Sequence, residues 1–321
     1  MRRAVLLTGA LRTIRKTMKF FLRNVLRGDG RVSVFACVQN DTAESEESWT
    51  AWLREQIGVA LVDVVWFSVD RFPGWKEQRE LLLSHMTVSE SWKGYLRSSG
   101  SMIEYYQLQL AYLKMCHMEA VGGFRFDYVI RARTDSIYAQ PVDFAWLGWG
   151  VAEVEARMTA IRDVMGAVDD RAMLTYVMAT LWSPKVVENL PFVEVSMTPS
   201  PGSGAIPSTA EGVLAYLQNG RYIQTLRKNN LYVVRRDFFY LIPMLGTMYG
   251  TMRSPVADDY WFNAEGQFRD ACYYSCLDVH DYSSAFEERS LAYPSQWNEA
   301  DFFDGEGEVI HPRMVYCVVR R

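Results

Sequence analysis

The sequence lacks several features that would assign it to a class at once. None of its apolar runs approaches the roughly 20 residues that a membrane-spanning helix needs, so we expect no transmembrane segment. The glycine patterns G-x-G-x-x-G and G-x-x-x-x-G-K-[ST], which mark dinucleotide and nucleoside-triphosphate sites, are also missing. The net charge is −4, without the basic footprint that nucleic-acid binding needs. We therefore expect no nucleic-acid partner.

Cysteine is also scarce. The chain has five cysteines, an odd number, and no clear secretory signal, which favours a reducing compartment over a disulfide framework. The first residues, MRRAVLLTGALRT, contain only a short apolar run before further basic residues follow. We interpret this segment as a first buried strand rather than a signal peptide. The expected location is the cytoplasm.

Apolar and aromatic residues are plentiful. Hydrophobic residues make up 49% of the 321 positions, which is enough for a large core in one domain or two. Aromatic residues make up 14%, with ten Trp and eighteen Tyr. Such a content suits carbohydrate-binding surfaces, where a sugar packs on a ring, and it equally suits an aromatic core.

Short apolar runs alternate with amphipathic stretches near the N-terminus. The runs lie at residues 4–7, 32–38 and 61–67, and helical patterns at residues 14–27 and 44–58 separate them. This alternation is typical of an α/β fold with a mostly parallel, doubly wound sheet. A long helix is expected that Ser101 caps and Gly122-Gly123 ends. Its predicted apolar stripe comprises Ile103, Tyr106, Leu110, Leu113, His117 and Ala120.

Residues 124–141, FRFDYVIRARTDSIYAQP, begin as an apolar strand and end in charge. Because side chains alternate along a strand, Arg131, Arg133 and Asp135 are expected on one face. Ligands of open α/β sheets lie beyond the carboxyl ends of the strands. Arginine binds phosphate bidentately and a carboxylate can hold a divalent cation, so the row suits a diphosphate. The alternative is a structural arginine–aspartate network.

Polar residues also follow the neighbouring strands. Thr8, Gly9 and Arg12 lie at the end of the first strand, where a glycine turn lets the backbone approach a nucleotide and Arg12 is either a phosphate ligand or a solvated side chain. Asn40 and Asp70 follow the second and third strands and are candidates for contacts to a base or ribose.

The second half of the chain gives weaker signals. A helix is expected over residues 153–181, and residues 196–208 form either a lid or a plain surface loop. A strand at residues 231–234 runs into Asp237. The spacing of Cys272, Cys276 and His280 would place them on one helix face, either as a buried face or, less favoured, as metal ligands. The candidate general bases are Glu265, Asp237 and Asp259.

The order LLTGALRT, a long amphipathic helix and FDYVIRARTD resembles a group of GT-A-type glycosyltransferases from bacterial polysaccharide gene clusters and large DNA viruses of algae. In that group an Arg-x-Arg-x-Asp segment stands where other GT-A enzymes carry Asp-x-Asp, and a stretch similar to WFNAEGQF at residues 261–268 forms an acceptor-side helix. Here the segment is Arg131, Arg133 and Asp135, with a single acidic residue.

The resemblance implies a GT-A-like α/β enzyme, a hexosyl- or pentosyltransferase that moves a sugar from a nucleotide-diphosphate donor, UDP-linked or similar, to a glycan acceptor. Residues 1–141 would form the nucleotide-sugar half, and residues 142–321 the mixed α+β acceptor half of one continuous domain. Asp135 would hold Mn²⁺ or Mg²⁺, with Arg12, Arg131 and Arg133 neutralising the phosphates. Polysaccharide biosynthesis in the cytoplasm, or in the host cytoplasm for a viral chain, would follow.

Two other classes of function stay open. The chain either retains the fold as an inactive carbohydrate- or nucleotide-binding module, or it is another phosphate-handling transferase, such as a nucleotidyl- or sulfotransferase. The loop TGALRT has no lysine, which argues against a nucleotidyltransferase. The donor, the acceptor, the stereochemical outcome and the oligomeric state are not encoded in any pattern that we recognise.

Overall fold

The structure is a computed structural model of the chain. It describes residues 1–26, 31–72, 74–85, 89–98, 100–182, 187, 190–248, 264–284, 300, 303–310, 314 and 316–319. The chain divides into two compact units. The first comprises residues 1–12, 30–134 and 233–275, and the second comprises residues 13–29, 135–232 and 276–321. The assignment of residues 1–141 to donor binding and of residues 142–321 to acceptor binding stays a prediction.

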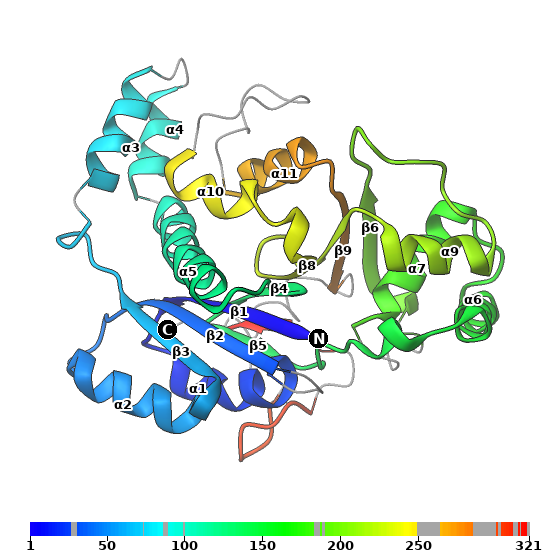
Figure 1. Cartoon of the computed structure of the whole chain (residues 1–321), viewed down its shortest axis with the longest axis horizontal. Coiled ribbons are helices and arrows are strands. Elements are labelled where there is room, and N and C mark those ends of the chain that lie inside the picture. Colours follow the sequence, from blue (N-terminus) through cyan, green and yellow to red (C-terminus); the bar gives the residue numbers. More distant parts are fainter. Residues whose placement is uncertain are drawn as a thin grey trace. The chain divides into compact units, whose positions relative to one another are not determined.

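The first unit is built on a parallel sheet with the strand order β3-β2-β1-β4 (Figure 1). Its strands are β1 (Arg2–Ala10), β2 (Arg31–Gln39), β3 (Leu61–Trp66) and β4 (Tyr128–Arg133). β1 pairs with β2 and β4, and β2 pairs with β3, in each case in parallel. The central residues of β1 and β2 are buried, as the continuous apolar runs predict for strands covered on both faces. The predicted mostly parallel α/β sheet is therefore confirmed.

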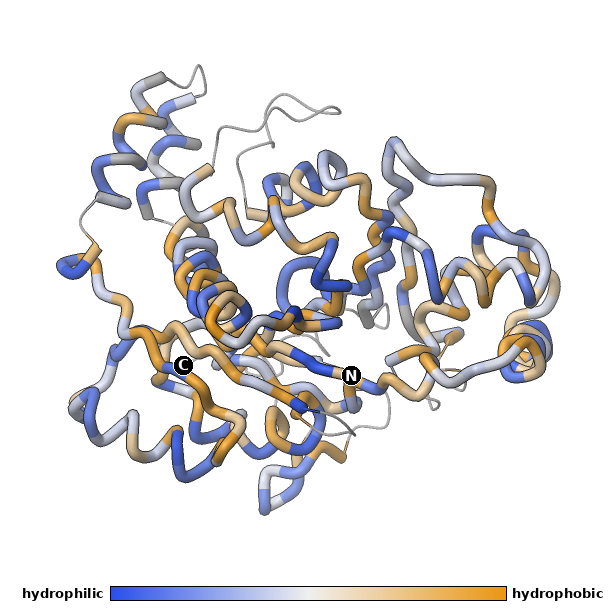
Figure 2. The backbone as a smooth tube through the Cα atoms, viewed as in Figure 1, coloured by the Kyte–Doolittle hydropathy of each residue, from blue (hydrophilic) through white to orange (hydrophobic). Residues whose placement is uncertain are grey.

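Helices cover both faces of this sheet. α2 (Glu46–Ile57) packs on β3, whereas α5 (Ser101–Gly122) packs on β1 and β2 from the other side (Figure 1). α10 (Leu241–Met248) packs along α5, and α11 (Ala264–Tyr274) packs on α10. α2 begins at Ser45, whose side chain accepts a hydrogen bond from the backbone N–H of Ser48. Figure 2 shows hydrophobic residues along β2 and β3 and hydrophilic residues on the outer turns of α2.

The buried face of α5 differs from the predicted stripe. His117 and Leu113 are exposed, whereas Tyr105, Leu108 and Met115 are buried. The true stripe is rotated because α5 packs on the sheet and on α10 at once, and the spacing of apolar residues alone does not show which side each neighbour takes. The expectation that His117 belongs to the core is therefore wrong.

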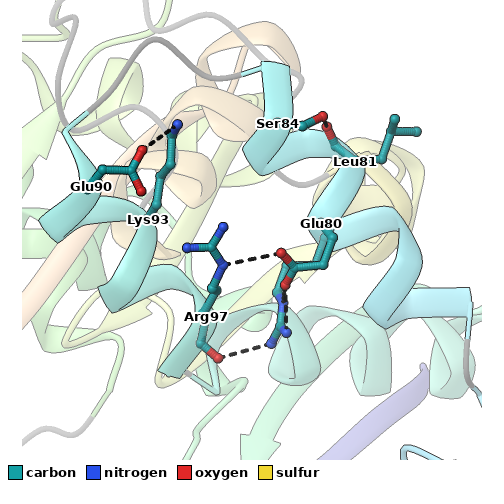
Figure 3. Close-up of polar contacts among 7 residues, drawn as sticks. Glu80, Leu81, Ser84, Glu90, Lys93 and Arg97 are labelled. Atoms are coloured by element: carbon teal, nitrogen blue, oxygen red, sulfur yellow. Dashed lines mark hydrogen bonds and ion pairs between the residues drawn. The ribbon is translucent and has the colours of Figure 1, made fainter.

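Helices α3 (Gly74–His85) and α4 (Glu90–Ser98) precede α5, and the ion pair of Glu80 with Arg97 joins them, whereas the other surface pairs lie within one helix (Figure 3). The carboxylate of Glu80 binds two arginines: Oε1 accepts from Arg79 at 2.9 Å, and Oε2 accepts from Nε of Arg97 at 3.2 Å. Nζ of Lys93 donates to Glu90 at 2.9 Å. Exposed pairs of this kind contribute little to stability.

β8 (Leu231–Arg235) lies next to β4 and runs in the opposite direction. The backbone N–H of Arg236, just after β8, donates to the carbonyl of Asp127, just before β4. The end of β8 therefore lies at the amino-terminal edge of the parallel strands. This orientation decides which charged residues can meet at the carboxyl ends.

The second unit contains its own strands and helices. The strands are β5 (Ser136–Tyr138), β6 (Val193–Thr198), β7 (Tyr222–Leu226), β9 (Asp278–Ser284) and β10 (Tyr316–Val318). The helices are α1 (Ile14–Phe20), α6 (Val151–Met165), α7 (Asp170–Thr180) and α9 (Ala210–Asn219). β9 lies between β7, to which it is parallel, and β6, to which it is antiparallel. β5 and β10 form an antiparallel pair.

Two sequence expectations for the second unit need correction. The single helix expected over residues 153–181 is two helices, because Gly166 adopts a φ of +77° after α6 and Asp169 caps α7 through the backbone N–H of Ala172. The helix expected at residues 14–27 is α-helical only to Phe20 and continues as a π-helical turn over Phe21–Val25. Among the described residues, no helix combines the length and the apolar content needed to cross a membrane.

Candidate functional site

Two arginines and one glutamate meet at the carboxyl end of β4. Arg131 donates from Nη2 to Oε1 of Glu104 at 2.5 Å, and Arg133 donates from Nη1 to Oε2 of the same carboxylate at 3.3 Å. The two arginines therefore share one face of the strand, as the alternation of side chains predicts. Glu104 lies in the first turn of α5, where a carboxylate also complements the helix dipole.

The two arginines differ in their access to solvent. The side chain of Arg131 is 2% exposed, whereas those of Arg133 and Glu104 are 26% and 21% exposed. Arg131 needs a fixed counter-charge because a buried guanidinium without one is strongly unfavourable. Arg133 can still reach an external anion, and a guanidinium keeps its charge at every physiological pH.

The turn beside Arg133 is tightly built. Gly9, the penultimate residue of β1, has a φ of +135°, and a Cβ at this position would collide with the hydroxyl of Thr134. That hydroxyl donates to the carbonyl of Ala10 at 2.6 Å. Thr8 pairs with Arg133 across the two strands, so both side chains lie on the same face of the sheet. The Thr8 hydroxyl is buried and has no hydrogen-bond partner within the described part of the chain.

The loop after β2 contributes a second charged group at this edge. The backbone N–H of Arg12 donates to Oδ1 of Asp41 at 3.0 Å, and its guanidinium donates to Oδ2 at 3.4 Å. Arg12 is about half exposed. The predicted ligand Asn40 is engaged within its own loop: its carbonyl oxygen accepts from the N–H of Thr42 at 3.1 Å, and its amide donates to the carbonyl of Glu44 at 2.7 Å.

Asp70 is exposed in the turn after β3. β3 lies at the edge of the sheet, three positions from β4, so these two strands are about 14 Å apart at the usual strand spacing. Asp70 therefore follows a strand that is not paired with β4.

Asp135, the predicted metal ligand, belongs to the second unit, where its Oδ1 accepts a hydrogen bond from the Ser136 hydroxyl at 3.3 Å. Within the described ranges, no three His, Cys, Asp or Glu side chains are arranged to hold a metal ion. Asp135 alone supplies one protein oxygen. This donor set fits Mg²⁺ or Mn²⁺ only when most of the other ligands come from substrate phosphates and water, as is usual for Mg²⁺.

The predicted general bases fall in different places. Glu265 is exposed in the first turn of α11, and this turn is attached to α5 because the Tyr105 hydroxyl donates to the carbonyl of Ala264 at 2.5 Å. Tyr105 follows Glu104 directly, so Glu265 lies near the end of α5 that faces the arginines. Asp259 lies outside the described residues.

Asp237 lies at the opposite edge of the sheet. It follows the end of β8, which runs antiparallel to β4, and it pairs with Nε of Arg125 at 3.3 Å before β4 begins. The sequence shows that a charged residue follows the strand, but the strand's direction places this residue away from Arg133. Asp237 therefore has no part in the site built here.

The same edge contains a buried ion pair. Arg236 donates from Nε and Nη2 to the carboxylate of Glu119 at 2.8 to 3.1 Å, and from Nη1 to the carbonyl of Phe239 at 3.2 Å. Oε1 of Glu119 also accepts from the backbone N–H of Phe126 at 3.0 Å. Both side chains are at least nine-tenths buried, so this pair is part of the core of the first unit.

A second buried polar cluster lies in the second unit. The Tyr216 hydroxyl lies 2.9 Å from Oδ2 of Asp278 and 2.8 Å from Nε2 of His280. Oδ1 of Asp278 accepts from the backbone N–H of Ser200 at 2.8 Å and from the hydroxyl of Ser203. The loop expected at residues 196–208 begins later, because residues 196–198 belong to β6, and its Ser200 and Ser203 are attached to β9 through Asp278. Burial lowers the pKa of His280 to about 4, so the ring is neutral at physiological pH.

The possible cysteine–histidine metal site is not formed. α11 ends at Tyr274, Cys276 adopts a φ of +53° beyond it, and His280 belongs to β9, so these residues do not share a helix face. Burial raises the pKa of the Cys272 thiol, which therefore stays protonated. The spacing predicts a common face only if the helix continues, and it does not.

Comparisons with known proteins give matches in structure only. No family model and no curated protein sequence matches the chain. Core-mannan synthase A (CmsA/Ktr4) from Aspergillus fumigatus, in its Mn/GDP form, is similar with 12% identity and a TM-score of 0.32, over 86% of this chain and 72% of that chain. The mannosyltransferase Ktr4p from S. cerevisiae in complex with GDP is similar with 10% identity and a TM-score of 0.30, over 85% of this chain and 66% of that chain.

Sequence reasoning missed two residues of the site. Glu104 precedes Arg131 by 27 residues and lies off the predicted stripe of α5, so nothing local connects it with the arginines. Its acidic character in the first turn of a long helix is the one available signal. Asp41 follows Asn40 at the end of β2, and its pairing with Arg12 depends on how two loops meet, which the sequence does not show.

Proposed function

We propose that the chain is a glycosyltransferase of the GT-A type, which moves a sugar from a nucleotide-diphosphate donor to a carbohydrate acceptor. The observation that carries the proposal is the pair Arg131 and Arg133 on one strand face at the carboxyl end of a parallel sheet. An adjacent turn at Gly9 brings two backbones close together. The leaving group of such a reaction is a diphosphate, whose developing charge needs fixed cations.

The residues take distinct parts in this proposal. Arg133 binds the diphosphate, Arg131 holds Glu104 behind it, and Arg12 supplies a second exposed cation at the same edge. Thr8 and Gly9, at the end of β1, contact the bound donor from the side of the sheet. Asp135, two residues along the chain from Arg133, holds a divalent cation that the donor brings with its phosphates. Asp135 would thereby add positive charge, through that cation, to the neutralisation of the leaving diphosphate.

Contacts to the base or ribose are assigned to Asp70 and to the backbone of the Asn40 loop, because the amide of Asn40 is engaged within that loop. Glu265 is the proposed general base for the acceptor hydroxyl if the reaction inverts configuration, since its helix begins beside the first turn of α5. Residues 142–321, which include Glu265 and the loop that follows β6, are the proposed acceptor half.

The experiment is a donor panel. UDP- and GDP-linked sugars are incubated with the protein, Mn²⁺ or Mg²⁺ and a mixture of oligosaccharides, and release of nucleotide is measured together with the mass of the glycan. Arg133→Gln should abolish most of the release. Arg125→Gln is the matched control, because Arg125 also pairs with a carboxylate at 3.3 Å but lies at the opposite edge.

Three outcomes separate the functions. Transfer that depends on Arg133 supports the proposal, and full activity of Glu265→Gln would remove that residue as base. Binding of a nucleotide sugar without turnover would identify an inactive binding module. Equal activity of Arg133→Gln and the wild type would contradict the proposed site.

A further inference from the structure

The carboxylate of Glu104 binds the same guanidinium groups that the proposed donor would bind. Each of its oxygens accepts from a different arginine, Oε1 from Arg131 and Oε2 from Arg133. A diphosphate presents oxygens of the same charge and hydrogen-bonding type as a carboxylate. Glu104 therefore competes with a ligand for at least part of this site.

The two halves of the contact are unequal. The Arg131 bond is short and its guanidinium is 2% exposed, whereas the Arg133 bond is longer and its guanidinium is 26% exposed. A buried charged pair is strongly unfavourable to break, while a partly exposed pair contributes about 1 kcal/mol or less. A ligand can thus displace the carboxylate from Arg133 without separating it from Arg131.

We propose that Glu104 is an internal counter-anion that releases Arg133 when a diphosphate binds and returns to it when the diphosphate leaves. This inference rests on the proposed function of the site. Glu104 remains bound to Arg131 throughout. The same carboxylate therefore positions Arg131 and limits the affinity of Arg133 for the diphosphate. The consequence for catalysis is faster release of the nucleotide product.

The test uses calorimetric titration of inorganic pyrophosphate, UDP and GDP into the full chain. Glu104→Gln keeps an oxygen acceptor for Arg131 and removes the competing charge, so its affinity for each ligand should rise about five-fold, the factor that corresponds to about 1 kcal/mol. Glu80→Gln is the matched control, because Glu80 also binds two arginines but lies on α3, where it faces Arg97 of α4 (Figure 3). Its affinities should equal those of the wild type.

A double-mutant cycle separates competition from a merely structural role. If Glu104 acts through Arg133, the gain in affinity from Glu104→Gln disappears when Arg133 is already Gln. Glu104→Asp, which keeps the charge, should gain less affinity than Glu104→Gln. Circular dichroism of each variant checks that it is folded, and the Glu104→Asp protein provides the comparison if Glu104→Gln does not fold.

The outcomes distinguish this inference from the proposed function. If the wild type binds nucleotide and Glu104→Gln binds it equally or more weakly, the counter-anion role is wrong and the glycosyltransferase proposal stands. If neither protein binds pyrophosphate or either nucleotide, with or without Mn²⁺, both proposals are overturned. A gain that persists in the Arg133→Gln background would also contradict the inference.

Discussion

Helix α5 has a glutamate near each end, and the two carboxylates bind arginines in opposite settings. Glu119, at the amino-terminal edge of the sheet, holds Arg236 through three short hydrogen bonds, and both side chains are buried. Glu104, about 22 Å away along the helix, holds Arg131 and a partly exposed Arg133. The same residue types therefore form a buried core pair at one end and a partly exposed cluster, our proposed ligand site, at the other.

The difference follows from strand direction. The parallel strands β1, β2 and β4 direct their carboxyl ends toward Glu104, where the side chains of Glu104 and Arg133 are partly exposed. At the other edge the antiparallel β8 brings Arg236 back over the strand starts and covers Glu119. Burial, rather than the presence of an arginine and a glutamate, separates a structural pair from a candidate ligand site.

The largest effect is expected from a substitution that removes the buried ion pair of Glu119 and Arg236. Glu119→Gln leaves the buried guanidinium of Arg236 without its counter-charge, and we expect it to lower the free energy of unfolding by about 3–5 kcal/mol. Urea denaturation measures this loss. Asp237→Asn, next to Arg236 but in an exposed pair, should change stability by less than about 0.5 kcal/mol. Equal effects of the two variants would contradict the distinction between closed and open pairs.

The buried cluster at His280 provides a second closed network, tested by pH. Because burial lowers the pKa of His280 from 6.5 to about 4, the unfolded chain takes up the proton first as the pH falls. The contribution of the neutral ring is complete above about pH 6.5 and is lost as the pH falls toward 4. Between pH 7 and pH 5 the wild type should lose about 2 kcal/mol more stability than His280→Gln. Parallel losses in the two proteins would show that His280 is not buried as described.

At the open end, the backbone turn is expected to matter more than any single surface pair. Gly9→Ala forces a non-glycine residue to adopt a φ of +135° and brings its Cβ against Thr134. We expect a loss of about 1–3 kcal/mol in stability, together with weaker nucleotide binding. Gly58→Ala, which also has a positive φ but open space around the new Cβ, isolates the strain from the collision. A Gly9→Ala protein as stable as the Gly58→Ala protein would exclude the collision.

Much of the first unit follows from local sequence patterns. The apolar runs that form β1, β2 and β3 and the alternation that brings Arg131 and Arg133 onto one face are visible in the residues themselves. The link to Glu104 is not visible, because it depends on how α5 crosses the sheet. Asp237 shows the same limit, because the sequence of β8 contains no sign of its antiparallel direction. Long-range packing decides these positions, and short-range periodicity does not encode it.

The central claim is that Arg133 binds a diphosphate at the open end of α5. The most direct test is calorimetric titration of UDP and GDP, with Mn²⁺, into the wild type, Arg133→Gln and Arg125→Gln. Charge-assisted hydrogen bonds contribute about 1.5–3 kcal/mol, so Arg133→Gln should weaken the binding of one nucleotide about ten-fold or more. Arg125→Gln should bind as the wild type does. Binding that is unchanged in Arg133→Gln, or equally weakened in both variants, would contradict the account.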